Sequence, residues 1–229
     1  MGRYIESVAA DLSRHSILDP GNLLIIQERE RLLLRTLRRH GIRALDDVRV
    51  FEAGCAGGYN LRLMVQWGAR PENVAGIDLS EESVAYCREH APAIRVHCGS
   101  AVAIPEADRS FDVALAFTLF SSVPDDDVAR GIGQELIRIV RPGGLILVYD
   151  MRRNNPRNLA VHRVGRDDIG RWFPNCPVRT RSLTLLPPLA RPVGRHAPFL
   201  YAPLGALPFL RSHELHVLRR RASPIFAAA

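Results

Sequence analysis

Glycines and one carboxylate in the first third of the chain have the spacing of a site for an adenosine-bearing cofactor. An apolar segment runs through Glu52 into the glycine-rich turn 54–58. Glycine lets the backbone of such a turn approach a ligand closely and adopt positive φ angles without a Cβ penalty. The next apolar segment ends in Asp78. A carboxylate at that point can accept hydrogen bonds from both hydroxyls of a ribose, so the two segments together predict a nucleoside-binding site.

Polar residues at the end of the apolar run 144–150, and just after it, are candidates for binding the substrate and for catalysis. Asp150 ends this run and could act as a general base or bind a substrate hydroxyl, or it could close an Asx-turn. Histidine titrates near neutral pH, so His162 is a second candidate base, with a surface residue as the alternative. A third group could clamp an anion and bind hydroxyls, unless the loop is simply solvated: Arg152, Arg153, Asn154, Asn155 and Arg157.

Alternating strands and helices must position these residues. This alternation predicts βαβ units, an α/β fold and a mostly parallel sheet. Ligands of open α/β sheets bind beyond the carboxyl ends of the strands, which places 117–122 and 150–155 at the mouth of the site. The expected strands are 48–53, 74–78, 94–98, 111–117 and 144–150, and the helices between them are 58–68, 81–90 and 125–140.

Other segments flank this core. Apolar spacing predicts a helix over 23–40, with Asn22 as its N-cap. Residues 187–210 are rich in Pro, Leu and Phe and carry few charges. They could form a lid that excludes water, accept a lipid tail, or pack against the sheet. The C-terminal third is further predicted to contain a short helix over 165–173 and strands at 178–185 and 214–218.

These elements predict one domain with three parts. We expect an N-terminal helical cap at 1–46, a cofactor-binding core at 47–152, and a C-terminal part at 153–229 that completes the sheet and carries the apolar insertion. The cysteines form no C-x-x-C pair, which predicts neither a zinc site nor a disulfide framework. They are Cys55, Cys87, Cys98 and Cys176.

The charge of the chain is unevenly distributed. All 31 basic residues are arginines, and the formal net charge is +7. Residues 1–150 contain 17 arginines against 21 acidic residues, whereas 151–229 contain 14 arginines against three. The basic C-terminal third indicates an anionic substrate or surface, such as a phosphorylated or acidic sugar, a lipid head group or nucleic acid, or else a solvated face.

The glycine pattern discriminates between cofactors. A dinucleotide fingerprint, G-x-G-x-x-G from Gly54, fails at Ala56 and Tyr59, and a P-loop needs a lysine, which the chain lacks. The pattern that fits is E-x-G-x-x-x-G over 52–58. Three further elements follow it in order: Asp78, Gly99-Ser100-Ala101 and the Arg-Pro-Gly-Gly segment 141–144.

With these motifs, residues 47–152 resemble the class I S-adenosylmethionine-dependent methyltransferases, in particular the type-11-like domain. The resemblance implies a Rossmann-like, mostly parallel seven-stranded sheet flanked by helices, with an antiparallel C-terminal edge. It implies that Asp78 binds the ribose of S-adenosylmethionine. The other cofactor contacts that it implies are Glu52, Gly54, Cys55 and Gly58 beside the methionine part, Leu79, Ser100 and Ala101 beside the adenine, and Phe117 on the other side.

Two residues depart from the family pattern. Ala56 replaces the middle glycine of the loop, which costs little if its φ is negative. Ser100 replaces the usual adenine-contacting aspartate, and the lost charge assistance is worth roughly 1 kcal/mol. We expect these changes to weaken cofactor binding without abolishing it.

The sequence therefore predicts a metal-independent methyltransferase that acts on a small molecule or glycan, with oxygen preferred to nitrogen. The oxygen preference follows the resemblance to biosynthetic enzymes of bacterial polysaccharides and natural products. The alternatives are a non-catalytic binding module, a nucleic-acid methyltransferase and, last, a nicotinamide oxidoreductase. The start of the chain lacks an apolar signal core, so we expect a cytoplasmic protein that could touch the inner face of the membrane.

Overall fold

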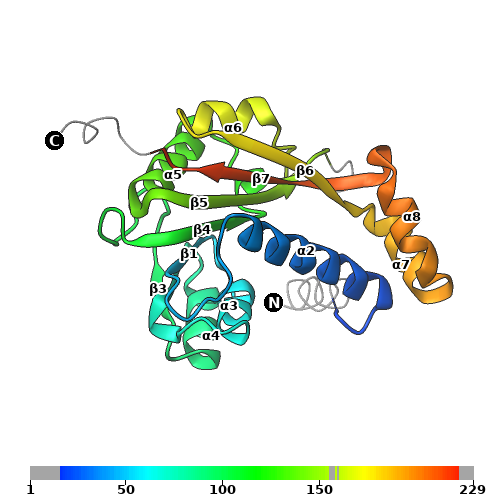
Figure 1. Cartoon of the computed structure of the whole chain (residues 1–229), viewed down its shortest axis with the longest axis horizontal. Coiled ribbons are helices and arrows are strands. Elements are labelled where there is room, and N and C mark those ends of the chain that lie inside the picture. Colours follow the sequence, from blue (N-terminus) through cyan, green and yellow to red (C-terminus); the bar gives the residue numbers. More distant parts are fainter. Residues whose placement is uncertain (1–15, 155–157, 159, 222–229) are drawn as a thin grey trace, which may run out of the picture. The chain divides into compact units, whose positions relative to one another are not determined.

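The computed structural model describes residues 16–154, 158 and 160–221 of the chain (Figure 1). Its centre is a seven-stranded sheet with the order β3-β2-β1-β4-β5-β7-β6, as the α/β prediction requires. The strands are β1 (Val50–Ala53), β2 (Val74–Asp78), β3 (Arg95–Cys98), β4 (Phe111–Phe117), β5 (Val140–Met151), β6 (Val178–Leu185) and β7 (Arg211–Arg219).

The first five strands are parallel and β1 lies in the middle of them. Glu52 on β1 is opposite Gly76 on β2 and Leu115 on β4. β7 runs antiparallel to β5. Near their ends the Gly143 N–H donates to the Arg220 carbonyl, and the Arg220 N–H donates to the Gly144 carbonyl. The Arg-Pro-Gly-Gly segment 141–144 is expected from its sequence to form a turn before the strand at 144–150. This expectation is wrong, because these residues already belong to β5, whose pairing with β4 shifts in register between Phe111 and Val113.

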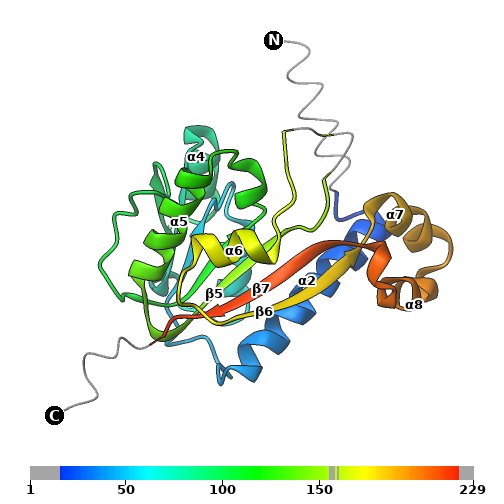
Figure 2. The same ribbon diagram turned by 90° about the horizontal axis from the view of Figure 1, so that it is seen from above.

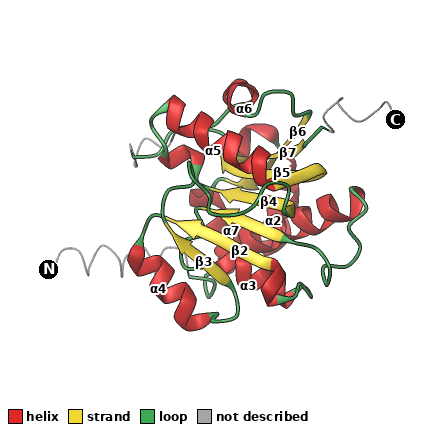
Figure 3. Ribbon diagram, turned by 90° about the vertical axis from the view of Figure 1, so that its left-hand side faces the viewer, coloured by secondary structure: helices red, strands yellow, loops and turns green. Residues whose placement is uncertain are grey.

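Four helices cover the two faces of the sheet. α3 (Tyr59–Gln66) and α4 (Glu81–His90) lie on one face, and α5 (Asp126–Ile139) and α6 (Arg166–Trp172) lie on the other (Figure 3). The second face holds the main hydrophobic core, in which the ring of Phe120 stacks on Trp172 at 5.0 Å. This core fixes the segment that follows β4, which is one wall of the expected site.

Polar groups close both ends of α5. Asp125 is the N-cap, and its carboxylate accepts hydrogen bonds from the backbone N–H groups of Asp127 and Val128. At the other end the guanidinium of Arg220 donates to the carbonyls of Arg138 and Val140. Such contacts satisfy the backbone groups that a helix leaves unpaired at its ends. They hold α5 in register with the sheet.

The chain separates into two compact units. Unit 1 combines residues up to Ile42 with Ser182–His213, and unit 2 combines Arg43–Arg181 with the residues from Glu214 onward. The helices of unit 1 include α2 (Pro20–Arg39), α7 (Pro187–His196) and α8 (Tyr201–Ala206), with short 3-10 turns at η3 (Pro198–Leu200) and η4 (Pro208–Leu210). The cofactor motifs all lie in unit 2.

Unit 1 is held together by α2 packed on α7 (Figure 2). The expected N-cap Asn22 is wrong by three residues: Asp19 caps α2, and its side chain accepts hydrogen bonds from the N–H groups of Gly21 and Asn22. Glu28 on α2 accepts hydrogen bonds from the Thr184 N–H and the Tyr201 hydroxyl. No helix in the described part of the chain is long and apolar enough to cross a membrane.

Candidate cofactor and acceptor site

The glycine-rich loop between β1 and α3 has a shape that only small residues permit. Gly54 and Gly58 have φ angles of +69° and +77°. A Cβ at Gly54 would lie 2.9 Å from the Leu119 side chain, and one at Gly58 would lie 2.3 Å from the sulfur of Cys87. The loop therefore keeps its open backbone because these two positions carry no side chain.

Asp78 fastens this loop to the end of β2. One carboxylate oxygen accepts a hydrogen bond from the Ala56 N–H at 2.7 Å, and the other accepts from the Ser80 N–H at 2.9 Å. A carboxylate oxygen has more than one acceptor site, so both oxygens can accept further bonds from a diol. Leu79, the next residue, is 74% exposed and open to contact. The structure thus brings together the predicted loop and the predicted ribose acceptor.

Ala56 differs from the expectation. Its φ is +44°, so the condition of a negative φ fails and the residue lies in the left-handed region that alanine disfavours. The hydrogen bond from its N–H to Asp78 holds it there. The departure from glycine at this position therefore stores strain in the loop.

Glu52 and Cys55 lie beneath the loop. The side chain of Glu52 is 1% exposed and accepts a hydrogen bond from the Asn60 amide at 2.6 Å. Cys55 is buried and its side chain packs toward Gly76. Burial raises the pKa of the Cys55 thiol, and the Glu52 carboxylate raises it further, so the thiol stays neutral. A cofactor would meet Cys55 through its backbone.

The segment after β3 supplies the third predicted contact. The Gly99 N–H donates to the backbone carbonyl of Asp78 at 2.9 Å, which joins this segment to the ribose acceptor. Ser100 is half-buried, and its hydroxyl is 3.4 Å from the Val102 N–H. Ala101 is part of the core. Ser100 therefore has a hydroxyl near the expected adenine edge.

The segment after β4 forms the opposite wall. Phe117 is buried, and its ring lies 5.6 Å from that of Tyr149. Thr118 has a φ of +52°, and its N–H donates to the Tyr149 carbonyl at 2.7 Å. This bend directs the chain so that Leu119 lies against Gly54. The loops after β1, β2, β3 and β4 are thus connected at one edge of the sheet.

Both predicted acceptor-side residues meet at Ser121. The Asp150 carboxylate is fully buried and accepts hydrogen bonds from the N–H groups of Ser121 at 3.1 Å and Met151 at 2.8 Å. Burial raises the pKa of Asp150, and these hydrogen bonds oppose that rise. The Ser121 carbonyl accepts from the N–H of His162, whose side chain is half-buried. Asp150 and His162 are therefore both hydrogen-bonded to the backbone of Ser121, one to its N–H and the other to its carbonyl.

The predicted arginine and asparagine group divides. Arg152 is ion-paired with Glu214 at 3.3 Å, Arg153 is exposed, and the Asn154 side chain accepts from the Arg163 N–H. The other predicted members, Asn155 and Arg157, lie outside the described residues.

Two residues of β7 near this edge were not predicted from the sequence. Glu214 pairs with Arg152, and burial raises the pKa of its carboxyl. His216 is fully buried and shares a hydrogen bond with the Thr180 hydroxyl at 3.0 Å. Burial lowers the pKa of His216 to about 4, so its ring is neutral at pH 7. The available signal was that Glu214 is one of three acidic residues after position 150.

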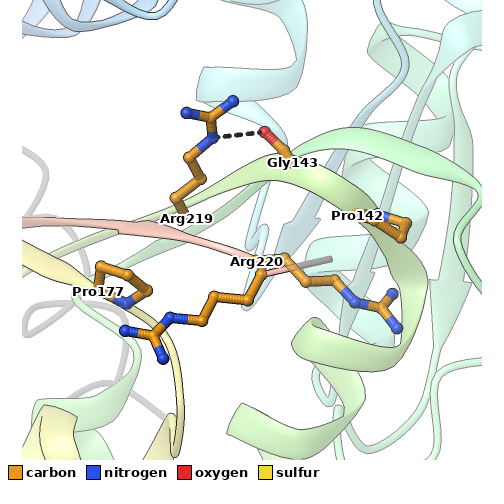
Figure 4. Close-up of a pocket in the computed structure, with 6 residues that line it drawn as sticks. Pro142, Gly143, Pro177, Arg219 and Arg220 are labelled. Carbon is orange, nitrogen blue, oxygen red and sulfur yellow. Dashed lines mark hydrogen bonds between the residues drawn. The ribbon is translucent and has the colours of Figure 1, made fainter. Parts of the chain in front are cut away.

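A pocket of about 350 Å³ lies at the start of β5, which is the opposite end of the parallel strands (Figure 4). Arg219 donates to the Gly143 carbonyl at 3.3 Å, and Arg220 donates to the end of α5. These guanidinium groups bind the protein's own backbone. The pocket is lined by Pro142, Gly143, Pro177, Arg219, Arg220 and Arg221.

No cluster of three or more metal-binding side chains occurs among the described residues. The four cysteines are all free thiols.

Comparison with known proteins agrees with this geometry. Residues 50–144 match the profile of a family described as "Methyltransferase domain". A ubiquinone biosynthesis O-methyltransferase of Sinorhizobium medicae is 31% identical over 134 residues, which cover 57% of this chain and 51% of the relative. A probable S-adenosylmethionine-dependent methyltransferase of Mycolicibacterium smegmatis is 32% identical over 134 residues, covering 58% of this chain and 46% of the relative. The chain thus spans about half the length of the curated relatives it matches.

Solved structures with a similar fold include methyltransferases as well. The crystal structure of an S-adenosylmethionine-dependent methyltransferase from Methanosarcina mazei superposes with a TM-score of 0.58 at 14% identity. The match covers 82% of this chain and 98% of the other. At this identity the likeness concerns the fold, and the expected Rossmann-like sheet is confirmed by it.

Proposed function

Because residues 50–144 form a methyltransferase domain of the class I, S-adenosylmethionine-dependent family, we propose that the chain methylates a hydroxyl of a small molecule or glycan. The observation that carries the proposal is the carboxylate of Asp78, which holds the loop 54–58 by the Ala56 N–H and keeps acceptor sites for a ribose. A dinucleotide would need glycine where Tyr59 stands.

The residues of this edge fit S-adenosylmethionine. Gly54 and Gly58 let the loop bend closely over Leu119 and Cys87, where a Cβ would collide, and Asp78 would hold the ribose hydroxyls. Leu79 would contact the adenine, with Ser100 at its edge. Once bound, the cofactor supplies an electrophilic methyl group on a positively charged sulfur. The role of the protein is then to align the acceptor and to exclude water.

A hydroxyl acceptor must lose a proton when it is methylated. We assign the role of proton acceptor to His162, which is half-buried and therefore accessible to a substrate. Asp150 is fully buried, so we assign it a positioning role. The Asp150 carboxylate accepts a hydrogen bond from the Ser121 N–H, and the Ser121 carbonyl accepts one from the backbone N–H of His162. Arg152 and Asn154 lie just beyond and would bind acceptor oxygens.

The preference for oxygen rests on chemistry and on similarity. The polar groups at the mouth are suited to hydroxyls and acids, and the 31% identical relative carries O-methyltransferase in its name. A lipid-linked glycan belongs to the same acceptor class. We further propose that the protein works at the inner face of the membrane. The chain spans only about half of that relative, so the relative's own acceptor is not carried over to this protein.

Methyl-labelled cofactor tests this function. The protein is incubated with it and with fractionated extract of the source cell, and the labelled product is then treated with mild base. An ether methyl on a hydroxyl survives mild base, whereas a methyl ester is released as methanol. We expect base-stable label in a small-molecule, glycan or lipid fraction, and Asp78→Asn as the negative control.

Two outcomes separate the alternatives. Label that precipitates with nuclease-sensitive material would support a nucleic-acid methyltransferase and overturn the acceptor proposal. Cofactor binding without label in any fraction, under conditions where a known methyltransferase labels its acceptor, would support a non-catalytic binding module. His162→Asn should lower the rate and change its pH profile while leaving cofactor affinity unchanged, as expected for a base.

A further inference from the structure

Two identical turns in unit 1 expose aromatic rings. η3 and η4 both have the sequence Pro-Phe-Leu, and they flank α8. Phe199 in η3 is 77% exposed and Phe209 in η4 is 60% exposed. Phenylalanine is normally among the buried residues, so two exposed rings on matching turns need an explanation. Each proline fixes the backbone just before its ring, which presents the ring on a rigid turn.

These rings belong to a wider concentration of exposed apolar side chains. Nine of the fourteen large hydrophobic side chains that are exposed in the described residues lie in unit 1. Leu18, just before α2, is 89% exposed. This excess of exposed apolar side chains in unit 1 favours an interaction surface there. The nine are Ile17, Leu18, Leu23, Leu34, Leu189, Phe199, Leu200, Leu207 and Phe209.

The charge of the same segment indicates what covers it. Residues 187–210 contain Arg191, Arg195 and His196 and no acidic residue. Two carboxylates contact this segment: Asp19 is ion-paired with Arg195 at 2.5 Å, and Glu28 accepts a hydrogen bond from the Tyr201 hydroxyl. Over the described residues of unit 1, eight arginines face three acidic residues. A surface that carries negative charge is therefore attracted rather than repelled.

We propose that unit 1 docks on a lipid bilayer that contains anionic phospholipid. Phe199 and Phe209 enter the interface, and Arg191 and Arg195 lie at the level of the phosphates. Aromatic and leucine side chains combined with arginines are typical of interfacial binding elements. The two rings project from separate turns, which suits a fluid surface, because such a surface imposes no complementary shape. This inference does not depend on methyl transfer.

Vesicle sedimentation tests the proposal with the full chain. The vesicles are pure phosphatidylcholine or an equal mixture of phosphatidylcholine and phosphatidylglycerol. We expect the protein to sediment with the mixture, and high salt to release it. The double variant Phe199→Glu/Phe209→Glu should lose at least about tenfold in affinity. Val128→Glu on α5, where Val128 is 41% exposed, is the matched control and should bind like the wild type.

A second variant excludes a folding defect. Phe199→Leu/Phe209→Leu keeps the apolar character and should retain most of the binding, and all variants should melt as the wild type does. The proposal is overturned if the wild type ignores the mixed vesicles, or if the double glutamate variant binds them equally well. Self-association that increases with concentration and is lost in the glutamate variant, without vesicle binding, would assign the surface to a second copy of the chain.

Discussion

At the residue scale, the backbone of the cofactor loop decides which side chains are tolerated. Ala56 occupies a left-handed conformation that its own side chain disfavours, and the carboxylate of Asp78 keeps it there. Strain of this kind persists only where surrounding contacts impose it.

Ala56→Gly should therefore stabilise the protein. Removing the methyl group relieves the left-handed strain, which outweighs the greater freedom of glycine in the unfolded chain by about 1 kcal/mol. The free energy of unfolding in urea measures the change, with Ala202→Gly on α8 as the matched control, which should destabilise. A lower stability for Ala56→Gly would contradict the left-handed assignment.

His216 predicts a specific dependence of stability on pH. Its pKa is about 4 in the folded protein because it is buried, and 6.5 is the ordinary value. A depressed pKa means that stability is full above pH 6.5 and decreases as the pH falls toward 4. This residue alone should remove about 2 kcal/mol between pH 7 and pH 5.

His216→Gln measures this contribution. Its free energy of unfolding should change less between pH 7 and pH 5 than that of the wild type, whatever its stability at pH 7. His213, whose pKa burial also lowers to about 4, contributes in both proteins and cancels in the comparison. His196→Gln on an exposed site should behave as the wild type does. Parallel curves for wild type and His216→Gln would refute the assignment.

Sequence patterns indicate the candidate cofactor residues more clearly than the candidate acceptor residues. Glu52, Gly54, Gly58 and Asp78 follow one another at fixed spacings along the chain, so their pattern is visible in the sequence. Glu214 meets Arg152 only because β7 returns antiparallel to β5. Such a pairing is set by the order of strands, which local spacing does not encode.

At the element scale, periodicity predicted nearly every helix and strand of unit 2. The apolar stripe of α5 and the alternation in β6 are strong local signals. Two features were not predicted. β5 begins at Val140 because the Arg-Pro-Gly-Gly segment pairs as strand. Residues 187–210 are largely helical even with their prolines, because most of these prolines stand in the first turn of a helix, where the missing N–H is not needed.

The crossing of α2 and α7 predicts a sharp steric limit. A Cβ at Gly194 would lie 2.4 Å from the backbone nitrogen of Gly21. Backbone atoms cannot rotate away, so Gly194→Ala should destabilise unit 1 by about 2 kcal/mol. Gly205→Ala on α8, where a Cβ would meet nothing within 4 Å, is the matched control and should be neutral or stabilising.

Amide hydrogen exchange measures whether the loss of stability is confined to unit 1. Amides of α2 and α7 should exchange faster in Gly194→Ala than in the wild type, while those of β4 and β5 should be unchanged. Equal protection of α2 in Gly194→Ala and Gly205→Ala would contradict the close packing of the two helices.

At the scale of the whole molecule, the basic C-terminal third has mostly structural uses. Arg220 caps α5, Arg171 pairs with Asp126 and Asp168, and Arg211 donates to backbone carbonyls. The net charge therefore does not require nucleic acid as a partner. Unit 1 nevertheless keeps an excess of arginines over acidic residues among its described residues, and it is this unit for which we propose lipid binding.

Calorimetric titration with S-adenosylmethionine tests the central claim most directly. The wild type should bind one equivalent. Asp78→Asn should bind about 10- to 100-fold more weakly, because a charge-assisted pair of hydrogen bonds to the ribose is lost. Gly58→Ala should not bind measurably, since its Cβ would collide with Cys87. Asp47→Asn, at an 82% exposed side chain, should bind like the wild type. A folded wild type that binds no cofactor at millimolar concentration, or Gly58→Ala and Asp78→Asn variants that bind as tightly as the wild type, would contradict the account.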